Sequence, residues 1–261
     1  MIADPPTILA LDFDGVVCDG LIEYFQTAWR TYCQIWSPTN LTPPDDLAAQ
    51  FYRLRPVVET GWEMPVLLRA LMLGVPEAKI LQDWQAIARP LLRENNLNPA
   101  EIALQVDQIR DEWIATDLDD WLGKHRFYPG VIEKIKSLLA SSLQVTIVTT
   151  KEGRFVHQLL QQQGINLRDE WIIGKEVQQP KHQTLRQLLE TYSSNVVRIW
   201  FVEDRLKTLE SIQQQSDLNE VRLYLADWGY NTLQMRESIL HNPRIRLLSL
   251  SQFAQDFSVW N

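Results

Sequence analysis

The stretch TILALDFDGVVCD, residues 7–19, is a short apolar run that ends on closely spaced aspartates. Residues 7–11 are almost continuously apolar, which is typical of a strand buried on both faces of a sheet. Similar runs occupy residues 145–148, 171–173, 197–202 and 221–225. Segments with a helical spacing of apolar residues separate the runs, at residues 131–139, 155–163, 184–190 and 206–214. Strands that alternate with helices predict an α/β fold with a doubly wound, parallel, Rossmann-like sheet.

The alternation is interrupted between residues 20 and 125, where the apolar spacing is helical throughout and no strand-like run occurs. The segments LIEYFQTAWRTYCQIW and AEIALQVDQIRDEWIATDL, for example, are amphipathic at the helical period. Prolines divide this region into several helices. The sequence FYPG at residues 127–130 marks the return to the sheet. We therefore expect a core domain formed by residues 1–19 and 126–261, with an inserted all-helical domain at residues 20–125.

The composition limits the classes of partner. With 261 residues, 45% of them hydrophobic, the chain is long enough to bury a large core. The formal charge of -8 disfavours nucleic acid, because affinity for its phosphate backbone comes from clustered Lys and Arg. The apolar run near the N terminus is too short for a signal peptide, and no stretch approaches the roughly 20 apolar residues of a membrane helix. Two cysteines without metal-ligand spacing fit a reducing compartment, so we expect a cytoplasmic protein. We expect no nucleic-acid or membrane partner. The expected oligomeric state is a monomer or a homodimer.

Polar residues follow the predicted strands, and in an open parallel sheet ligands bind outside the carboxyl ends of the strands. These residues are Asp12, Asp14, Thr149, Thr150, Lys175, Lys181, Glu203 and Asp204. Carboxylates held together repel one another unless one is protonated or a cation lies between them. Oxygen ligands without clustered His or Cys favour Mg²⁺, which commonly also binds a substrate phosphate. The pattern therefore predicts a magnesium site that handles phosphate, with a carboxylate available as a nucleophile.

The order of these pieces resembles the haloacid dehalogenase superfamily, in particular its magnesium-dependent phosphatases that carry a helical cap after the first motif. Four segments resemble the four motifs of that superfamily in order: DFDGV at residues 12–16, VTTK at 148–151, Lys181, and FVED at 201–204. YPGV at residues 128–131 and WGY at 228–230 are similar to segments of phosphoglycolate phosphatase-like members. The resemblance covers the sheet domain and does not extend recognisably to the inserted helices.

The resemblance implies a role for each matching residue. Asp12 would attack the phosphorus and form an aspartyl-phosphate, while Asp14 would protonate the leaving oxygen and then activate water. Thr149 would hold a phosphoryl oxygen, and Lys181 would supply compensating positive charge. The Mg²⁺ cofactor would be bound by Asp12, Asp204 and the main-chain carbonyl of Asp14.

The sequence leaves three assignments in this site open. Gly15 fits either a tight turn with positive φ or a close approach of the backbone to phosphate. Lys175 competes with Lys181 for the role of the motif lysine. Glu203 is either a direct metal ligand or a support behind the ligands, and the choice matters because Thr208 occupies the position where many members have a further acidic residue.

Four further residues are candidates for contacts with the substrate. Thr150 and Lys151 follow the second strand, and Lys151 is either a solvated charge at a helix start or a contact for an anion. Arg55 and Glu59 lie in RLRPVVETGW, residues 53–62, which we expect to be a polar loop that could close over a substrate and read its leaving group. An ordinary loop whose arginines pair with nearby glutamates explains the same residues.

These observations predict a magnesium-dependent phosphatase that acts on a small phosphorylated metabolite, a phosphate monoester such as phosphoglycolate or a sugar phosphate. A phosphomutase on the same scaffold would pass the phosphoryl group to a second hydroxyl, and the sequence does not separate the two. A dehalogenase needs neither Mg²⁺ nor the second aspartate, so Asp14 and Asp204 argue against it. The alternative from a different class is a non-catalytic protein that keeps the fold and binds a ligand or partner.

Overall fold

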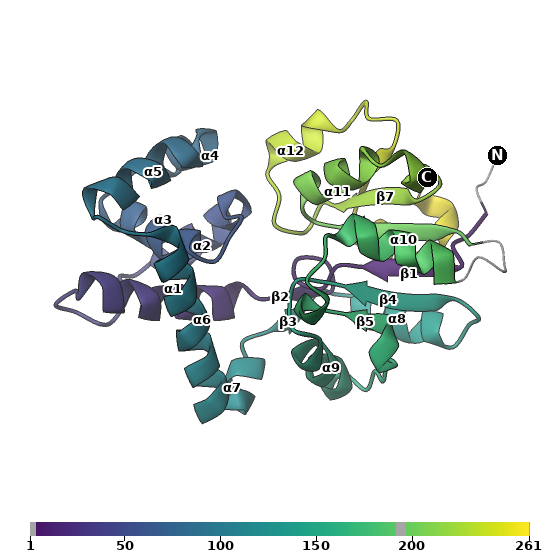
Figure 1. Cartoon of the computed structure of the whole chain (residues 1–261), viewed down its shortest axis with the longest axis horizontal. Helices are drawn as coiled ribbons and strands as arrows, with labels where there is room; N and C mark the ends of the chain where they lie inside the picture. Colours follow the sequence, from purple (N-terminus) through teal and green to yellow (C-terminus); the bar gives the residue numbers. More distant parts are fainter. Residues whose placement is uncertain (1–3, 192–196, 261) are drawn as a thin grey trace. The chain divides into compact units, whose positions relative to one another are not determined.

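The apolar run after residue 7 forms strand β1 (Ile8–Leu11), which lies inside a six-stranded sheet of order β5-β4-β1-β6-β7-β8 (Figure 1). The other strands are β4 (Gln144–Val148), β5 (Ile172–Ile173), β6 (Ile199–Glu203), β7 (Arg222–Ala226) and β8 (Ile245–Leu248). All neighbouring pairs in this sheet are parallel. This computed structural model describes residues 4–191 and 197–260, and it confirms the predicted α/β fold.

Strand β8 was not predicted, because it does not resemble the other strands in sequence. It lies at the edge of the sheet, and its burial is not continuous: Ile245 and Leu248 are buried, Arg246 is exposed and Leu247 is half-buried. The two central strands β1 and β6 are buried at every position. Because Arg246 interrupts the apolar residues of this short strand, a search for continuous apolar runs finds the other five strands and misses β8.

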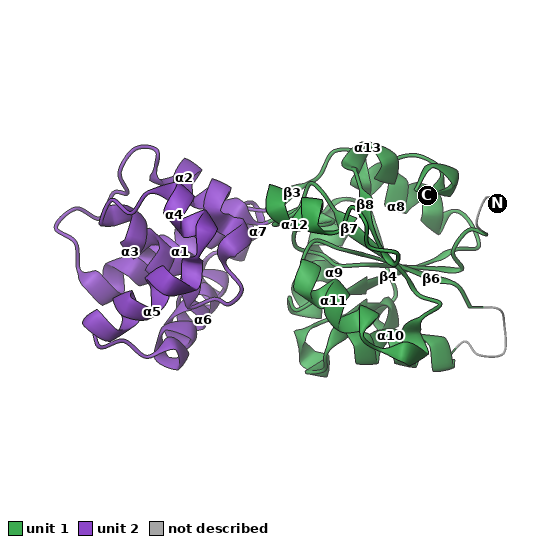
Figure 2. Cartoon of the chain, turned by 90° about the horizontal axis from the view of Figure 1, so that it is seen from above, with its two compact units in different colours: residues 1–19, 126–261 green, residues 20–125 purple. Residues whose placement is uncertain are grey.

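The chain divides into two compact units, coloured separately in Figure 2. Residues 1–19 and 126–261 form the sheet unit, and Gly20–His125 form the helical unit. A short antiparallel pair, β2 (Cys18–Asp19) with β3 (Arg126–Phe127), joins the two chain segments through which the helical unit is inserted. Neither strand shows the alternation or the continuous apolar run by which a strand is recognised in a sequence.

Helices cover both faces of the sheet. The helices of this unit are α8 (Val131–Leu139), α9 (Gly153–Gln162), α10 (Lys181–Thr191), α11 (Leu206–Gln213), α12 (Leu233–Ser238) and α13 (Leu250–Phe253). Leu185 of α10 and Leu209 of α11 pack on Phe201 and Leu223 of the strands in one buried cluster. Helices α8 and α13 lie on the opposite side of the sheet in Figure 2. The layers explain why the strands are apolar on both faces.

Aromatic side chains fill the side of the sheet opposite the α10–α11 layer. Trp200 of β6 lies 5.3 Å from Tyr224 of β7 and 5.7 Å from Trp260, measured between ring centroids. Phe253 of α13 lies 5.3 Å from Trp260 and 5.6 Å from Trp228. The C-terminal segment is therefore anchored in the core by Trp260, which is 1% exposed.

The helical unit has a separate hydrophobic core. Its helices are α1 (Leu21–Trp36), α2 (Leu47–Leu54), α3 (Glu63–Met72), α4 (Glu77–Gln82), α5 (Trp84–Glu94), α6 (Pro99–Thr116) and α7 (Leu118–Leu122). Phe25, Phe51 and Leu67 are among the residues that form this core. At the start of helix α6, the side chain of Asn98 accepts a hydrogen bond from Ala100 N, and Pro99 lies in the first turn.

The loop expected at residues 53–62 is partly helical. Helix α2 continues to Leu54, and a 3-10 turn follows over Arg55–Val57, so the loop itself begins at Val58. The other 3-10 turns are Asp169–Trp171, Lys175–Val177, Ser216–Leu218 and Phe257–Val259. Within the described residues, none of the helices combines the length and the apolar character that crossing a membrane requires.

Candidate active site

Asp12 and Asp14 lie directly beyond the carboxyl end of β1. The N–H of Asp12 donates to Val202 O at 2.9 Å, which continues the β1–β6 pairing by one residue and places Asp12 beside the end of β6. The chain then turns back, with Gly15 N donating to Cys18 O at 2.8 Å. Gly15 has a φ of +86°, and a Cβ at this position would lie 2.3 Å from Asp204 Oδ2. Both the turn and the close approach therefore require glycine.

Lys181, the first residue of α10, brings positive charge to this end of the sheet. Its Nζ lies 2.9 Å from Asp12 Oδ1 and donates to Glu203 Oε2 at 2.7 Å. The N–H of Phe13 also donates to Asp12 Oδ1, at 2.7 Å. Lys175, the competing lysine, is exposed on a 3-10 turn. The structure therefore brings Lys181 to Asp12, while Lys175 faces solvent.

Glu203 is the last residue of β6 and Asp204 follows it, and their carboxylates have different partners. Glu203 Oε1 accepts the N–H groups of Asp204 at 3.0 Å and Arg205 at 2.9 Å, while Oε2 accepts Lys181. Asp204 Oδ2 accepts the N–H of Tyr230 at 2.8 Å, but its buried Oδ1 has no hydrogen-bond partner among the described residues. This arrangement fits Glu203 as a support and Asp204 as a ligand.

Three buried carboxylates, those of Asp12, Glu203 and Asp204, each place an oxygen within 4.8 Å of the others. Burial and the charge of Glu203 raise the pKa of Asp12 to about 7, against the opposing effect of Lys181. Burial also raises the pKa of Glu203 and of Asp204. One lysine therefore does not compensate the negative charge of the cluster. A divalent cation with oxygen ligands, Mg²⁺ above all, fits both the donor set and the Asp204 oxygen that has no hydrogen-bond partner in the described part of the chain.

Asp14 and Lys151 form an ion pair. Lys151 Nζ lies 3.2 Å from each carboxylate oxygen of Asp14, and its side chain is only 9% exposed. The N–H of Lys151 donates to the hydroxyl of Thr149 at 3.1 Å, and Thr149 is buried. Thr150, in contrast, is exposed. Lys151 is therefore not the solvated charge that is common at a helix start.

The remaining two candidates lie in the helical unit. Arg55 donates to Val58 O at 2.9 Å, and its guanidinium carbon lies 4.8 Å from the ring centroid of Tyr24. The N–H of Glu59 donates to Glu63 Oε2 at 2.6 Å. These contacts fix the local conformation of the turn after α2.

Residues 227–231, between β7 and α12, belong to the site although no chemical signal in their sequence indicated it. Gly229 packs so closely on Asp204 that a Cβ would lie 2.2 Å from the Cβ of Asp204. Asn231 Nδ2 donates to Asp204 O at 3.0 Å, and Trp228 Nε1 donates to Val16 O at 3.1 Å. The resemblance of WGY to family members was the signal that could have found this segment.

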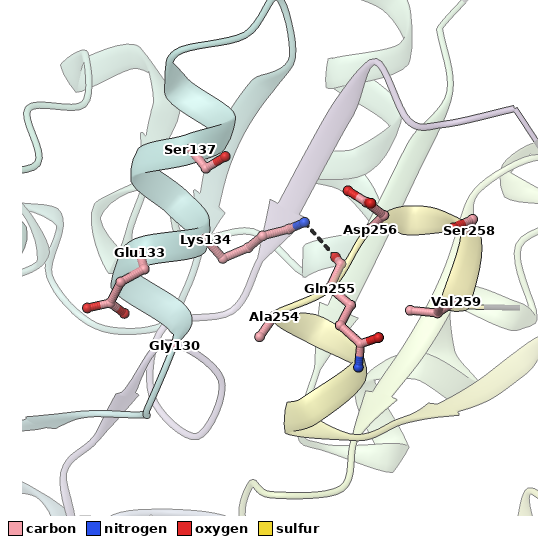
Figure 3. A pocket seen from close by; sticks show the side chains of 9 residues that line it. All are labelled: Gly130, Glu133, Lys134, Ser137, Ala254, Gln255, Asp256, Ser258 and Val259. Carbon is pink, nitrogen blue, oxygen red and sulfur yellow. Dashed lines mark hydrogen bonds between the residues drawn. The ribbon is translucent and has the colours of Figure 1, made fainter.

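A separate cleft of about 500 Å³ lies between α8 and the C-terminal segment (Figure 3). Lys134 crosses it and donates to Gln255 O at 2.6 Å, with Nζ 4.9 Å from the ring centroid of Phe257. None of the candidate site residues lines this cleft. Its contacts join the C-terminal segment to α8, and we assign it no part in the chemistry.

The family model for haloacid dehalogenase-like hydrolases matches residues 85–215, which is half of the chain. This range contains Thr149, Lys181 and Asp204, whereas Asp12 and Asp14 lie before it. No curated protein sequence matches the chain at a significant level.

Solved structures share the fold over nearly the whole chain. A predicted phosphoglycolate phosphatase from Haemophilus somnus has a TM-score of 0.57 at 15% identity, covering 97% of this chain and 95% of its own. A predicted phosphatase from Clostridium acetobutylicum has a TM-score of 0.56 at 12% identity, covering 95% of both chains. A haloacid dehalogenase-like family protein from Streptococcus pneumoniae has a TM-score of 0.52 at 16% identity, covering 93% of both chains. At such low identities, the likeness shows the fold alone.

Proposed function

The chain belongs to the haloacid dehalogenase-like hydrolases, and on this basis we propose that it is a magnesium-dependent phosphatase that hydrolyses a small phosphate monoester. The observation that carries the proposal is the carboxylate cluster, in which Asp12 is held by Lys181 while Asp204 Oδ1 is buried without a partner among the described residues. Transfer of a phosphoryl group requires positive charge beside the nucleophile, which Lys181 provides, and a carboxylate that can bind a cation, which Asp204 provides.

The proposed reaction has two displacements at phosphorus. Asp12 attacks, the bond between phosphorus and the ester oxygen breaks, and Asp14 gives its proton to the departing alcohol. Asp14 then takes a proton from water, whose oxygen attacks the phosphorus and releases inorganic phosphate and the Asp12 carboxylate. This order regenerates both aspartates.

Each supporting residue has a defined task in this proposal. Thr149 offers its hydroxyl to a phosphoryl oxygen, and Lys181 balances the charge on Asp12 and on the transferred group. Asp12, Asp204 and the main-chain carbonyl of Asp14 would hold Mg²⁺, while Glu203 holds Lys181 and the backbone after β6. When bound, the ion supplies positive charge that stabilises the phosphoryl oxygens during transfer.

Lys151 would contact an anionic group of the substrate, because a bound anion can replace Asp14 as the partner of its ammonium group. Thr150, Arg55 and Glu59 are proposed to contact the rest of the substrate, while Gly15 lets the backbone approach the phosphate. The proposed partner is a small phosphorylated metabolite, with no nucleic acid or membrane. The sheet unit would act as the catalytic core and the helical unit as its cap. A cytoplasmic location is consistent with Cys18 and Cys33 as free thiols.

The test is phosphate release from a panel of phosphorylated metabolites, including phosphoglycolate and sugar phosphates, with Mg²⁺ and with a chelator. We expect at least one compound to release inorganic phosphate at turnover rates only when Mg²⁺ is present. Asp12→Asn is the matched control, since the amide keeps the shape of the side chain but cannot attack phosphorus. Phosphate appearing on a second hydroxyl of the substrate, without free phosphate, would indicate a phosphomutase instead.

The non-catalytic alternative retains one supporting observation, the threonine at position 208. A folded protein that binds a panel compound but releases no phosphate at any Mg²⁺ concentration would favour this alternative over a phosphatase.

A further inference from the structure

The segment between β7 and α12 holds Asp204 from several directions. The N–H of Tyr230 donates to Asp204 Oδ2 at 2.8 Å, and Asn231 Nδ2 donates to Asp204 O at 3.0 Å. The backbone of Gly229 fills the space beside the Asp204 side chain. With Oδ2 held and the backbone fixed, Oδ1 is the Asp204 oxygen that remains without a hydrogen bond among the described residues.

Asn231 is well suited to set this geometry, because its own orientation is fixed. It is 4% exposed, and Nδ2 donates a second hydrogen bond to Ala226 O at 2.7 Å. Its Oδ1 accepts a long hydrogen bond of 3.4 Å from Arg236. One amide group therefore joins the end of β7, through Ala226, to the residue that follows β6, through Asp204.

The same segment also reaches the loop that carries Asp14. Trp228 Nε1 donates to Val16 O at 3.1 Å, and a Cβ at position 229 would lie 2.5 Å from Gly15 O. Asp12, Asp14 and Asp204, the proposed metal ligands, come from two separate strand ends, and residues 227–231 contact both of them. A segment with this placement can fix the spacing of the ligands.

We propose that Asn231 is a positioning residue for the metal site, which fixes Asp204 so that Oδ1 faces the divalent cation. The inference rests on the magnesium site of the proposed function, but it does not require that the protein be a phosphatase. Residues behind metal ligands typically change metal affinity by about 10- to 100-fold when they are altered, because the ligand loses its orientation. Loss of the Asn231 amide should therefore weaken metal binding before it affects any other property of the site.

The experiment measures Mg²⁺ binding to the purified full chain by isothermal titration calorimetry, with no substrate present. We expect Asn231→Ala to raise the dissociation constant for Mg²⁺ by about 10-fold or more. Asn231→Ser, which retains a short donor, should have a smaller effect in the same direction. Asn242→Ala is the control, since Asn242 also makes side-chain hydrogen bonds in the sheet unit, to Gln213 and to the backbone before β8, and none to the carboxylate cluster.

The outcomes separate this inference from the proposed function. Weaker Mg²⁺ binding in the Asn231 variants but not in Asn242→Ala supports the positioning role, whether or not the wild-type protein releases phosphate. A folded Asn231→Ala or Asn231→Ser variant that binds Mg²⁺ as tightly as the wild type overturns it. If the wild-type protein binds no Mg²⁺, both the positioning role and the proposed function fail. If it binds Mg²⁺ but hydrolyses no phosphate ester, only the proposed function fails.

Discussion

Each of the two units buries charged side chains, and the two buried groups differ in how far their negative charge is compensated by positive charge. In the helical unit, Glu23 is 0% exposed and its Oε1 accepts Arg110 Nε at 2.8 Å and the hydroxyl of Thr27 at 2.7 Å. In the sheet unit, the carboxylates of Asp12, Glu203 and Asp204 are buried together, and Lys181 pairs with two of them, Asp12 and Glu203. The first group is a carboxylate with a compensating guanidinium. The second carries excess negative charge.

This difference separates a structural role from a functional one. A balanced buried pair satisfies its own charges, and breaking it is costly for the fold. A buried group with excess charge of one sign keeps a high free energy until a ligand of opposite charge arrives, and such groups are typical of functional sites. Burial, and after it the charge of a neighbouring carboxylate, raises the pKa of all three carboxylates. We therefore expect variants of the balanced pair to change stability, and variants of the carboxylate cluster to change activity and Mg²⁺ binding.

The largest effect is expected for Asp12→Asn, which removes a charge from the unbalanced group. Activity should fall on the order of 10⁴-fold or more, because no other group can replace the nucleophile. The metal-free protein should not lose stability, since one of three repelling carboxylates is gone. Phosphate release and thermal unfolding without metal measure the two properties. A folded variant with wild-type turnover would show that Asp12 is not the nucleophile.

The next largest effect is expected for Glu23→Gln, which breaks the balanced pair and leaves Arg110 without its buried carboxylate. The free energy of unfolding should fall by about 3 kcal/mol, the lower end of the range for a fully buried pair, because the Arg110 side chain is 23% exposed and also lies 3.5 Å from Asp107. Chemical denaturation measures this loss. Mg²⁺ affinity should remain at the wild-type value at temperatures where the variant is folded. A large change in Mg²⁺ affinity with no loss of stability would reverse the roles assigned to the two groups.

Lys181→Met is expected to lower both the activity and the stability of the metal-free protein. It removes the positive charge beside Asp12, so activity should fall by about 10²- to 10³-fold, the size usual for loss of a group that stabilises transferred charge. The metal-free protein should also become less stable above neutral pH, where three carboxylates remain without a cation. Lys175→Met provides the matched control and should leave the stability of the carboxylate cluster unchanged. Equal losses in the two lysine variants would contradict the placement of Lys181.

A further effect is a change with pH. The pKa of Asp12 is raised from 3.8 to about 7, so the metal-free folded protein binds a proton there more readily than the unfolded chain does. Asp12 therefore stabilises the fold at low pH, and that stabilisation is lost as the pH rises from about 4 to about 7. Because Mg²⁺ competes with this proton, its affinity should increase over the same range and level off above it. Calorimetric titrations at several pH values would test this, and an affinity independent of pH would speak against an uncompensated Asp12.

Much of the sheet unit could be predicted from sequence because its central strands are buried on both faces. Each such strand is a continuous apolar run, and the residues that follow the runs meet at one edge of a parallel sheet. This geometry is why Asp12, Lys181 and Asp204 could be expected at one edge of the sheet, where the structure has them close together. Strand β8 was missed because Arg246 interrupts its apolar residues, and the β2–β3 pair was missed because neither Cys18–Asp19 nor Arg126–Phe127 is an apolar run.

The finer features of the site depend on contacts that no local pattern encodes. The pairing of Lys151 with Asp14 joins residues 137 positions apart and depends on how one lysine side chain is oriented. The hydrogen bond from Asn231 to Asp204 O depends on the turn after β7, which only the packed sheet determines. In the helical unit, the extension of α2 through Leu54 shows that a proline at position 56 can follow a helix through a 3-10 turn rather than a loop.

The central claim is that the unbalanced carboxylates form a cation site, and a calorimetric titration of Mg²⁺ into the wild-type protein and Asp204→Asn tests it most directly. The wild type should bind one ion per chain, and the variant should bind at least about 10-fold more weakly, because it loses the charge of a ligand whose Oδ1 is buried without a hydrogen-bond partner among the described residues. Wild-type protein that binds no Mg²⁺ at millimolar concentration, or a variant that binds it equally well, would contradict the claim.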